Sequence, residues 1–162
     1  MSKKIERGIL QGDSLSPLLF VLCMDPLSRQ LNGLYPKVSV KTDYGYHNTN
    51  HLLFIDDLKL ISKDETNLVA MLNETKEFFK TIGLEMNKEK SATNSGGCSE
   101  DAKLLEGPQG YKYLGITESH ASEVTPESLS RIKAEMIKRT RKFYKTKLST
   151  MNLFKAINEI KL

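Results

Sequence analysis

Residues 52–61 read LLFIDDLKLI, an apolar stretch that is interrupted at its middle by two adjacent aspartates, Asp56 and Asp57. The apolar residues on each side are typical of short strands that bury at least one face. We therefore expect a β-hairpin with strands over residues 51–55 and 58–62 and with both aspartates at its tip. A helix over these residues would exclude that arrangement.

The two aspartates are also a candidate metal site. Adjacent ionised carboxylates in apolar surroundings are costly to desolvate unless a positive charge neutralises them. Mg²⁺ suits such a pair, because it prefers hard oxygen ligands and keeps waters and phosphate oxygens in its shell. The alternative is an exposed hairpin turn, in which aspartate is favoured for reasons of local backbone geometry. This segment alone leaves both interpretations open.

A helix is expected upstream of the hairpin, where residues 16–22 read SPLLFVL. Ser16 can cap its first turn, Pro17 suits its first position, and the following residues are apolar almost all round. This pattern predicts a buried helix that Pro26 interrupts or kinks and that ends by Gly33 at the latest.

Strands are expected on both sides of the polar loop that contains Asp43 and Gly45. Val38 and Val40 alternate with polar residues, and Leu52 and Phe54 have the same two-residue spacing, which predicts that these two segments pair. Shorter strands are expected later in the chain, at residues 84–86, 91–93 and 111–116.

Two further helices complete an α+β fold. Residues 63–82 have apolar side chains at helical spacing and Gly83 as a stop, so Leu68, Leu72 and Phe79 should pack on the sheet. A second helix should start at Pro126. Its expected apolar stripe contains four residues: Leu129, Ile132, Met136 and Phe143.

Basic charge gathers at the C-terminal end. The whole chain has a formal net charge of +4, whereas residues 126–162 carry ten Lys and Arg against three Glu, a net charge of +7. Such a block favours a polyanion such as nucleic acid, although a solvated helix face has the same composition. The expected phosphate contacts are four residues: Lys138, Arg139, Arg141 and Lys142.

Several classes of protein are disfavoured. No window reaches the roughly 20 apolar residues that span a membrane, and an intracellular protein is expected. Cys23 and Cys98 lie in unrelated contexts, which indicates free thiols rather than a disulfide or a zinc site. The three histidines have no metal-ligand spacing, so the sequence does not support a metal-dependent nuclease.

A Gly-containing loop precedes the first helix. Residues 7–17 read RGILQGDSLSP, in which Gln11 can donate and accept hydrogen bonds and Gly12 lets a partner approach the backbone. An ordinary surface turn would look similar. The loop becomes informative through its order with three other segments: residues 54–57 (FIDD), residues 82–90 (IGLEMNKEK) and residues 111–116 (YKYLGI).

These four motifs resemble, in order and spacing, the polymerase motifs of reverse transcriptases, and most of all those of non-LTR retrotransposons. The resemblance covers about residues 7–116. It implies a palm-like antiparallel sheet with packed helices over residues 1–120 and the basic helical start of a thumb over residues 121–162. The implied activity is transfer of nucleotides from dNTP to a DNA primer on an RNA template.

The resemblance also implies a role for each matched residue. Asp56 and Asp57 would be catalytic and would ligate the Mg²⁺ ions of a two-metal site, in which the ions lie about 3.5 to 4 Å apart. Lys90 would offset charge on, or donate a proton to, the departing pyrophosphate. The nucleotide and template contacts would be Gln11 and Gly12, and the primer grip would be Tyr113, Leu114 and Gly115.

One feature of the family has no counterpart here. Reverse transcriptases carry a further catalytic aspartate on a strand upstream of the Gly-containing loop, and no residue of this chain matches it. We therefore expect a fragment whose metal site is incomplete, which needs the missing upstream segment as a partner and which is inactive alone. The alternative is a non-catalytic, nucleic-acid-binding remnant of a retroelement protein.

Overall fold

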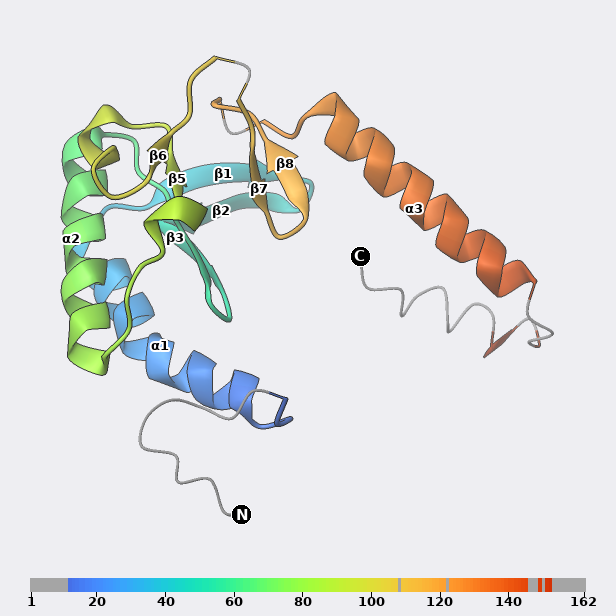
Figure 1. Ribbon diagram of the computed structural model, residues 1–162, viewed down its shortest axis with the longest axis horizontal. Helices are drawn as coiled ribbons and strands as arrows, with labels where there is room; N and C mark the ends of the chain where they lie inside the picture. The colour runs from blue at the N-terminus through green and yellow to red at the C-terminus, as the bar shows by residue number, and fades with distance from the viewer. Residues whose placement is uncertain (1–11, 108, 122, 146–148, 150, 153–162) are drawn as a thin grey trace. The chain divides into compact units, whose positions relative to one another are not determined.

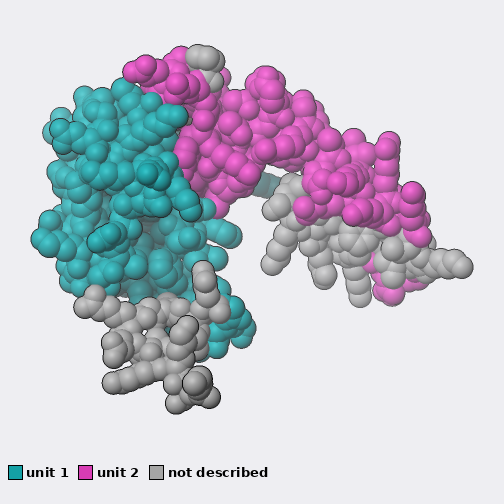
Figure 2. Space-filling model, in the orientation of Figure 1, with its two compact units in different colours: residues 1–104 teal, residues 105–162 magenta. Residues whose placement is uncertain are grey.

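The computed structural model describes residues 12–107, 109–121, 123–145, 149 and 151–152. The chain divides into two compact units, residues 1–104 and residues 105–162 (Figures 1 and 2). Both units combine helices with short strands, which confirms the α+β class. The described strands pair two by two rather than in one sheet.

Helix α1 (Ser16–Leu34) begins differently from the expectation. Leu15 occupies the N-cap position and Ser16 is already helical, so the predicted role of Ser16 as the cap is wrong. The turn before the helix is instead closed by Asp13, whose Oδ1 accepts a hydrogen bond from the Leu15 N–H at 2.8 Å. Asp13 takes this role because its short carboxylate reaches a backbone N–H two residues on.

Contrary to the expectation, α1 is neither buried along its whole length nor interrupted at Pro26. The helix runs through Pro26 and ends at Leu34, one residue beyond the expected stop. Proline leaves the carbonyl of Leu22 without its helical donor, and solvent can take that place because Leu22 is 59% exposed. Burial is confined to the second half of the helix, at Met24, Leu27 and Leu31. Leu15, Leu18, Leu19, Val21 and Leu22 are exposed.

Strands β1 (Val38–Thr42) and β2 (Gly45–Thr49) form an antiparallel hairpin. The predicted pairing of residues 38–40 with residues 52–54 is therefore wrong, because the polar loop between them supplies the partner strand. Gly45, with a φ of 121°, follows the turn, and the Thr42 hydroxyl donates to its carbonyl at 2.8 Å. The short turn thus pairs β1 with the adjacent β2 rather than with residues 52–54.

The hairpin predicted from residues 52–61 is present. Strands β3 (His51–Phe54) and β4 (Asp57–Leu60) pair antiparallel, from His51 opposite Leu60 to Phe54 opposite Asp57. Strand β3 ends one residue before the expected position, whereas β4 begins one residue earlier than expected, at Asp57, and ends two residues earlier, at Leu60.

Helix α2 (Glu65–Ile82) begins two residues later than expected, after an Asp64 cap, and ends at Gly83 as predicted. The Asp64 side chain accepts from the Asn67 N–H at 2.8 Å, and Gly83 ends the helix with a φ of 74°. The face that packs is displaced, since Met71 and Thr75 are buried whereas the expected residues Leu68, Leu72 and Phe79 are half-buried.

The core of the first unit joins both helices to the aspartate hairpin. Met24, Leu27 and Leu31 of α1 meet Met71 of α2 at its centre. Seven partly buried side chains surround them: Phe20, Tyr35, Leu53, Leu58, Leu60, Phe78 and Phe79. None of the described helices is long and apolar enough to cross a membrane.

The segment after α2 contains only short elements. They are the 3-10 helix η1 (Lys88–Lys90), strand β5 (Ala92–Thr93), the 3-10 helix η2 (Gly96–Cys98) and strand β6 (Lys103–Leu104), and β5 and β6 pair in parallel. The strand expected at residues 84–86 is absent, because the Leu84 N–H instead donates to the Phe79 carbonyl at the end of α2. Both cysteines are free thiols, as expected.

The second unit contains a hairpin and a helix. Strands β7 (Tyr111–Tyr113) and β8 (Ile116–Glu118) pair antiparallel, and helix α3 spans Pro126–Tyr144. The buried Ser128 links them, since its hydroxyl accepts from the Thr117 N–H at 3.0 Å. Of the expected apolar stripe, Leu129 and Met136 are exposed, Ile132 is half-buried, and the side chain of Phe143 lies outside the described part.

Candidate active site

The tip of the β3–β4 hairpin carries the two aspartates. Ile55 and Asp56 form its two-residue turn, and Asp57 is the first residue of β4. Ile55 has a φ of 54°. A β-branched residue in that region is strained by about 1 to 3 kcal/mol. Packing of the strands on either side must therefore hold the turn in this shape.

The two faces of this hairpin differ in chemistry. Leu53, Leu58 and Leu60 face the core, which anchors the strands. On the opposite face, Phe54 pairs with Asp57 and is 57% exposed. Both aspartates are exposed. The fold therefore presents two adjacent carboxylates to solvent on a rigidly anchored turn.

A buried polar cluster, which sequence patterns did not reveal, fixes the base of this hairpin. Asn50 is fully buried, and its side-chain amide donates to the carbonyls of Leu31 at 2.7 Å and Tyr35 at 3.1 Å. Its Oδ1 lies 2.7 Å from Nδ1 of His51, and the other ring nitrogen lies 2.8 Å from the Ser28 hydroxyl. These bonds tie the end of α1 to the start of β3.

The cluster favours the neutral form of His51. Because Asn50 uses its amide group on two carbonyls, its Oδ1 accepts from a protonated Nδ1, and Nε2 then accepts from Ser28. Burial, and secondarily the charge of Lys37, lower the pKa of His51 below its usual 6.5. The only sequence signal was an Asn-His pair immediately before an apolar strand.

Lys90, the candidate for charge neutralisation at the leaving group, is exposed at the end of η1. Asn87 caps this turn, since its Oδ1 accepts from the Lys90 N–H at 3.1 Å. The Ser91 hydroxyl donates to the Asn87 carbonyl at 2.8 Å. Residues 87–90 thus form a polar turn that holds the backbone of Lys90.

Of the two candidate template and nucleotide contacts, Gly12 belongs to the described residues and precedes α1 in the chain. Gly12 is exposed with a φ of 92°, a conformation that favours glycine. Gln11 lies outside the described residues. The assignment of both residues to nucleotide binding stays a prediction.

The candidate primer grip forms the turn of the β7–β8 hairpin. Leu114 and Gly115 have φ values of 47° and 85°, as a type I′ turn requires at its two central positions. Arg131 of α3 donates to the Gly115 carbonyl at 2.5 Å. The half-buried Tyr113 precedes the turn. This hairpin packs with α3 in the second compact unit, and the expected division at residue 120 stays a prediction.

The candidate phosphate contacts lie on α3. Lys138, Arg141 and Lys142 line one hollow along this helix. Arg139 and Lys138 also pair with Glu135, at 3.0 and 3.7 Å. The hydrogen bond from Arg139, followed by the charge of Lys138, lowers the pKa of that glutamate. Two of the four candidates therefore share an acidic neighbour.

The aspartate pair fits a hard divalent cation only in part. Its carboxylate oxygens are the donors that Mg²⁺ prefers, and their exposure leaves room for waters and phosphate oxygens. Within the described ranges, however, no group of three or more His, Cys, Asp or Glu residues gathers to hold a metal ion. The pair can contribute ligands, and other groups must complete the shell.

The structure groups the candidate residues into two sets. Asp56, Asp57, Lys90 and Gly12 belong to the first unit. The primer-grip turn and the basic residues of α3 belong to the second unit.

Comparison with protein families identifies the class. The model of the family described as "Reverse transcriptase (RNA-dependent DNA polymerase)" matches residues 1–117. This match covers well over half of the 162 residues, so the chain belongs to the reverse transcriptase family, a class of nucleotidyltransferases.

The relatives include polyproteins of R2 retrotransposable elements. The chain is 38% identical to the Pol polyprotein of the type-2 element R2DM of Drosophila melanogaster, over 75% of the chain and 11% of that protein. It is 29% identical to that of the type-1 element R2 of Popillia japonica, over 86% of the chain and 26% of that protein. The non-LTR resemblance is thereby confirmed. No solved structure matched the chain.

Proposed function

We propose that this chain supplies the aspartate-bearing part of an RNA-directed DNA polymerase. The activity is transfer of a nucleotide from dNTP to the 3′-hydroxyl of a DNA primer on an RNA template. The observation that carries the proposal is the hairpin tip, where the adjacent Asp56 and Asp57 are both exposed and the flanking strands are anchored in the core. Family membership makes nucleotidyl transfer the chemistry such a pair would serve.

The proposed roles follow from the chemistry of each side chain. Asp56 would hold Mg²⁺ directly, with Asp57 as the less direct partner. When bound, the metal supplies charge neutralisation at the primer hydroxyl and at the triphosphate. Lys90, held by the Asn87 turn, would offset charge on the leaving pyrophosphate or protonate it.

Binding of the substrates is assigned to the remaining candidates. Gln11 and Gly12 would line the nascent base pair. The turn at Tyr113, Leu114 and Gly115 would support the primer end, and the basic face of α3 would contact phosphates with little sequence preference.

The isolated chain should not extend a primer. Catalysis of this kind depends on positioning both reactants and neutralising charge in the transition state, which needs a complete metal shell. Within the described residues, no third His, Cys, Asp or Glu joins the aspartate pair to hold a metal ion. The chain also spans 11% and 26% of the lengths of the two R2 relatives, and the whole activity is proposed for a longer protein.

A chimera tests the proposal. Residues 1–117 of this chain would replace the matching region of the Drosophila R2DM polyprotein, and incorporation of a labelled deoxynucleotide on an RNA template with Mg²⁺ would be measured. We expect extension by the chimera and none by the 162-residue chain. A chimera that folds and binds primer and template without extending would favour the alternative, a non-catalytic nucleic-acid-binding remnant.

A further inference from the structure

The segment between α2 and the end of the first unit is fastened to α2 at two places. At the start of the helix, Glu65 accepts hydrogen bonds from the Ser95 hydroxyl, at 2.6 Å, and from the Gly97 N–H. Further along the same helix, Lys76 reaches Asp101. The candidate Lys90 lies within this segment, so both attachments bear on its position.

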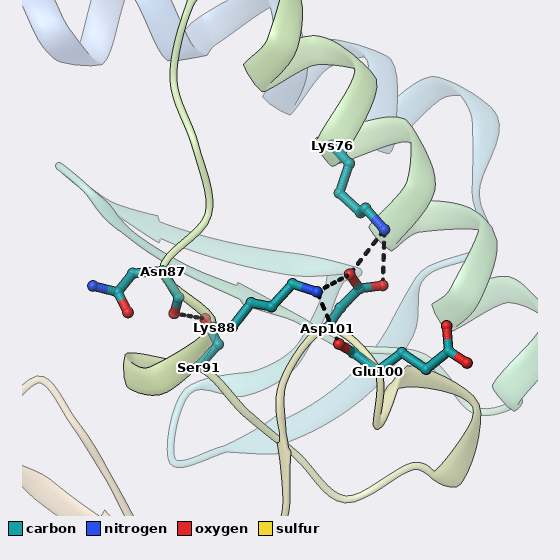
Figure 3. Close-up of polar contacts among 6 residues, drawn as sticks. All are labelled: Lys76, Asn87, Lys88, Ser91, Glu100 and Asp101. Carbon is teal, nitrogen blue, oxygen red and sulfur yellow. Dashed lines mark hydrogen bonds and ion pairs between the residues drawn. The ribbon is translucent and has the colours of Figure 1, made fainter.

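The second attachment is a three-residue ion-pair cluster (Figure 3). Lys76 Nζ donates to both carboxylate oxygens of Asp101 at 2.9 Å. Lys88 Nζ lies 3.7 Å from the same carboxylate and donates to the Glu100 carbonyl at 3.1 Å. The Asp101 side chain is only 16% exposed. We call Lys76, Asp101 and Lys88 the Asp101 bridge.

The bridge constrains the short helix η1 from one side. Lys88 is its first residue and Lys90 its last. In a 3-10 helix, with about 3 residues per turn, residues two positions apart lie about 120° apart around the axis. A Lys88 side chain held at Asp101 therefore leaves Lys90 on a different side of the turn.

The backbone after Lys90 is constrained as well. The Ser91 N–H donates to the Lys88 carbonyl at 3.2 Å, and the Lys103 N–H donates to the Ser91 carbonyl at 2.9 Å. Lys103 is two residues from Asp101 and begins β6. One side-chain bridge and one strand pairing thus fix the same turn.

We propose that Asp101 is a positioning residue, which acts through Lys88 to orient Lys90 toward the leaving group. This inference rests on the proposed function only for the role of Lys90. The bridge itself is a property of the folded chain and can be tested without activity.

Electrostatics explain why the carboxylate is needed. Asp101 is shared by two ammonium groups, so it offsets their mutual repulsion as well as attracting each one. Without it, Lys76 and Lys88 would repel each other across the gap between α2 and η1. The turn that holds Lys90 would then be free to move away from the helix.

Hydrogen exchange of the full 162-residue chain tests the bridge. In Asp101→Asn, the amides of Lys90 and Ser91 should exchange about three- to fivefold faster, as loss of a coupled surface pair implies. Lys88→Gln should do the same, and the double variant should be no faster than either. Lys88→Arg should restore protection, and the matched charge control Glu77→Gln, on the exposed face of α2, should change nothing.

Two results would overturn the bridge: unchanged exchange in both Asp101→Asn and Lys88→Gln, or strictly additive effects in the double variant. The chimera then separates this inference from the proposed function. Asp101→Asn should lower kcat for nucleotide addition without changing KM for primer and template. If extension depends on Asp56 but not on Asp101, the positioning role is wrong. If extension is independent of Asp56, the proposed function fails and the exchange data still decide the bridge.

Discussion

Replacement of Asn50 by Ala should strongly destabilise the first unit. The buried side chain donates two hydrogen bonds and accepts one from His51. Each bond contributes about 1 kcal/mol, and the truncation also leaves buried polar groups without partners. The Leu31 carbonyl keeps the Tyr35 N–H at 3.2 Å, which moderates the loss. We expect a loss of about 3 kcal/mol in the free energy of unfolding.

Urea denaturation, followed by circular dichroism, measures this loss. For a chain of 162 residues, about 3 kcal/mol corresponds to a decrease of roughly 6 to 12 °C in Tm. The matched control is Asn48→Ala, an exposed asparagine on the neighbouring strand, which should stay within about 0.5 kcal/mol. Equal effects of the two substitutions would refute the account of how α1 holds the aspartate hairpin.

Three further predictions concern pH, packing and salt. Because the pKa of His51 is lowered in the folded chain, the free energy of unfolding should decrease as the pH falls below about 6.5. Denaturation of His51→Gln between pH 5.5 and 7.5 should show a smaller decrease. Gly97→Ala would place a Cβ 2.8 Å from a carboxylate oxygen of Glu65 and should lower the free energy of unfolding by about 1 kcal/mol. Gly96→Ala, whose nearest contact would be at 3.8 Å, should be neutral, and equal losses for the two variants would contradict this packing. Replacing Arg141 and Lys142 by Gln should reduce the salt dependence of nucleic-acid affinity by about 1.4 to 1.8 logarithmic units per logarithmic unit of salt, and an unchanged slope would indicate a solvated face.

Local patterns predicted the elements whose signals are local. The hairpin at Asp56 follows from apolar segments on both sides of a polar break, and α2 follows from the helical spacing of its apolar residues and its Gly83 stop. The strands at residues 38–49 were paired wrongly because apolar alternation identified one strand, while the second, with a burial pattern of exposed residues, lacks that signal. Strand partners depend on turn geometry as much as on hydrophobicity.

The sequence predicted only those site residues that lie within contiguous motifs. Motif order pointed to Asp56 and Lys90, because both lie in contiguous segments. Asn50 and Asp101 were missed, since each acts on residues far away in the sequence: Asn50 on the end of α1, and Asp101 on Lys76. Only folding brings such groups together.

The proposed role of Asp56 as a catalytic metal ligand can be tested by one comparison in the R2DM chimera. Nucleotide incorporation by Asp56→Asn would be measured beside Asp43→Asn, a matched aspartate in the turn of the β1–β2 hairpin. We expect Asp56→Asn to lower the rate by at least about 10² to 10³ while primer–template binding is kept, and Asp43→Asn to have no effect. Undiminished incorporation by Asp56→Asn would contradict this role.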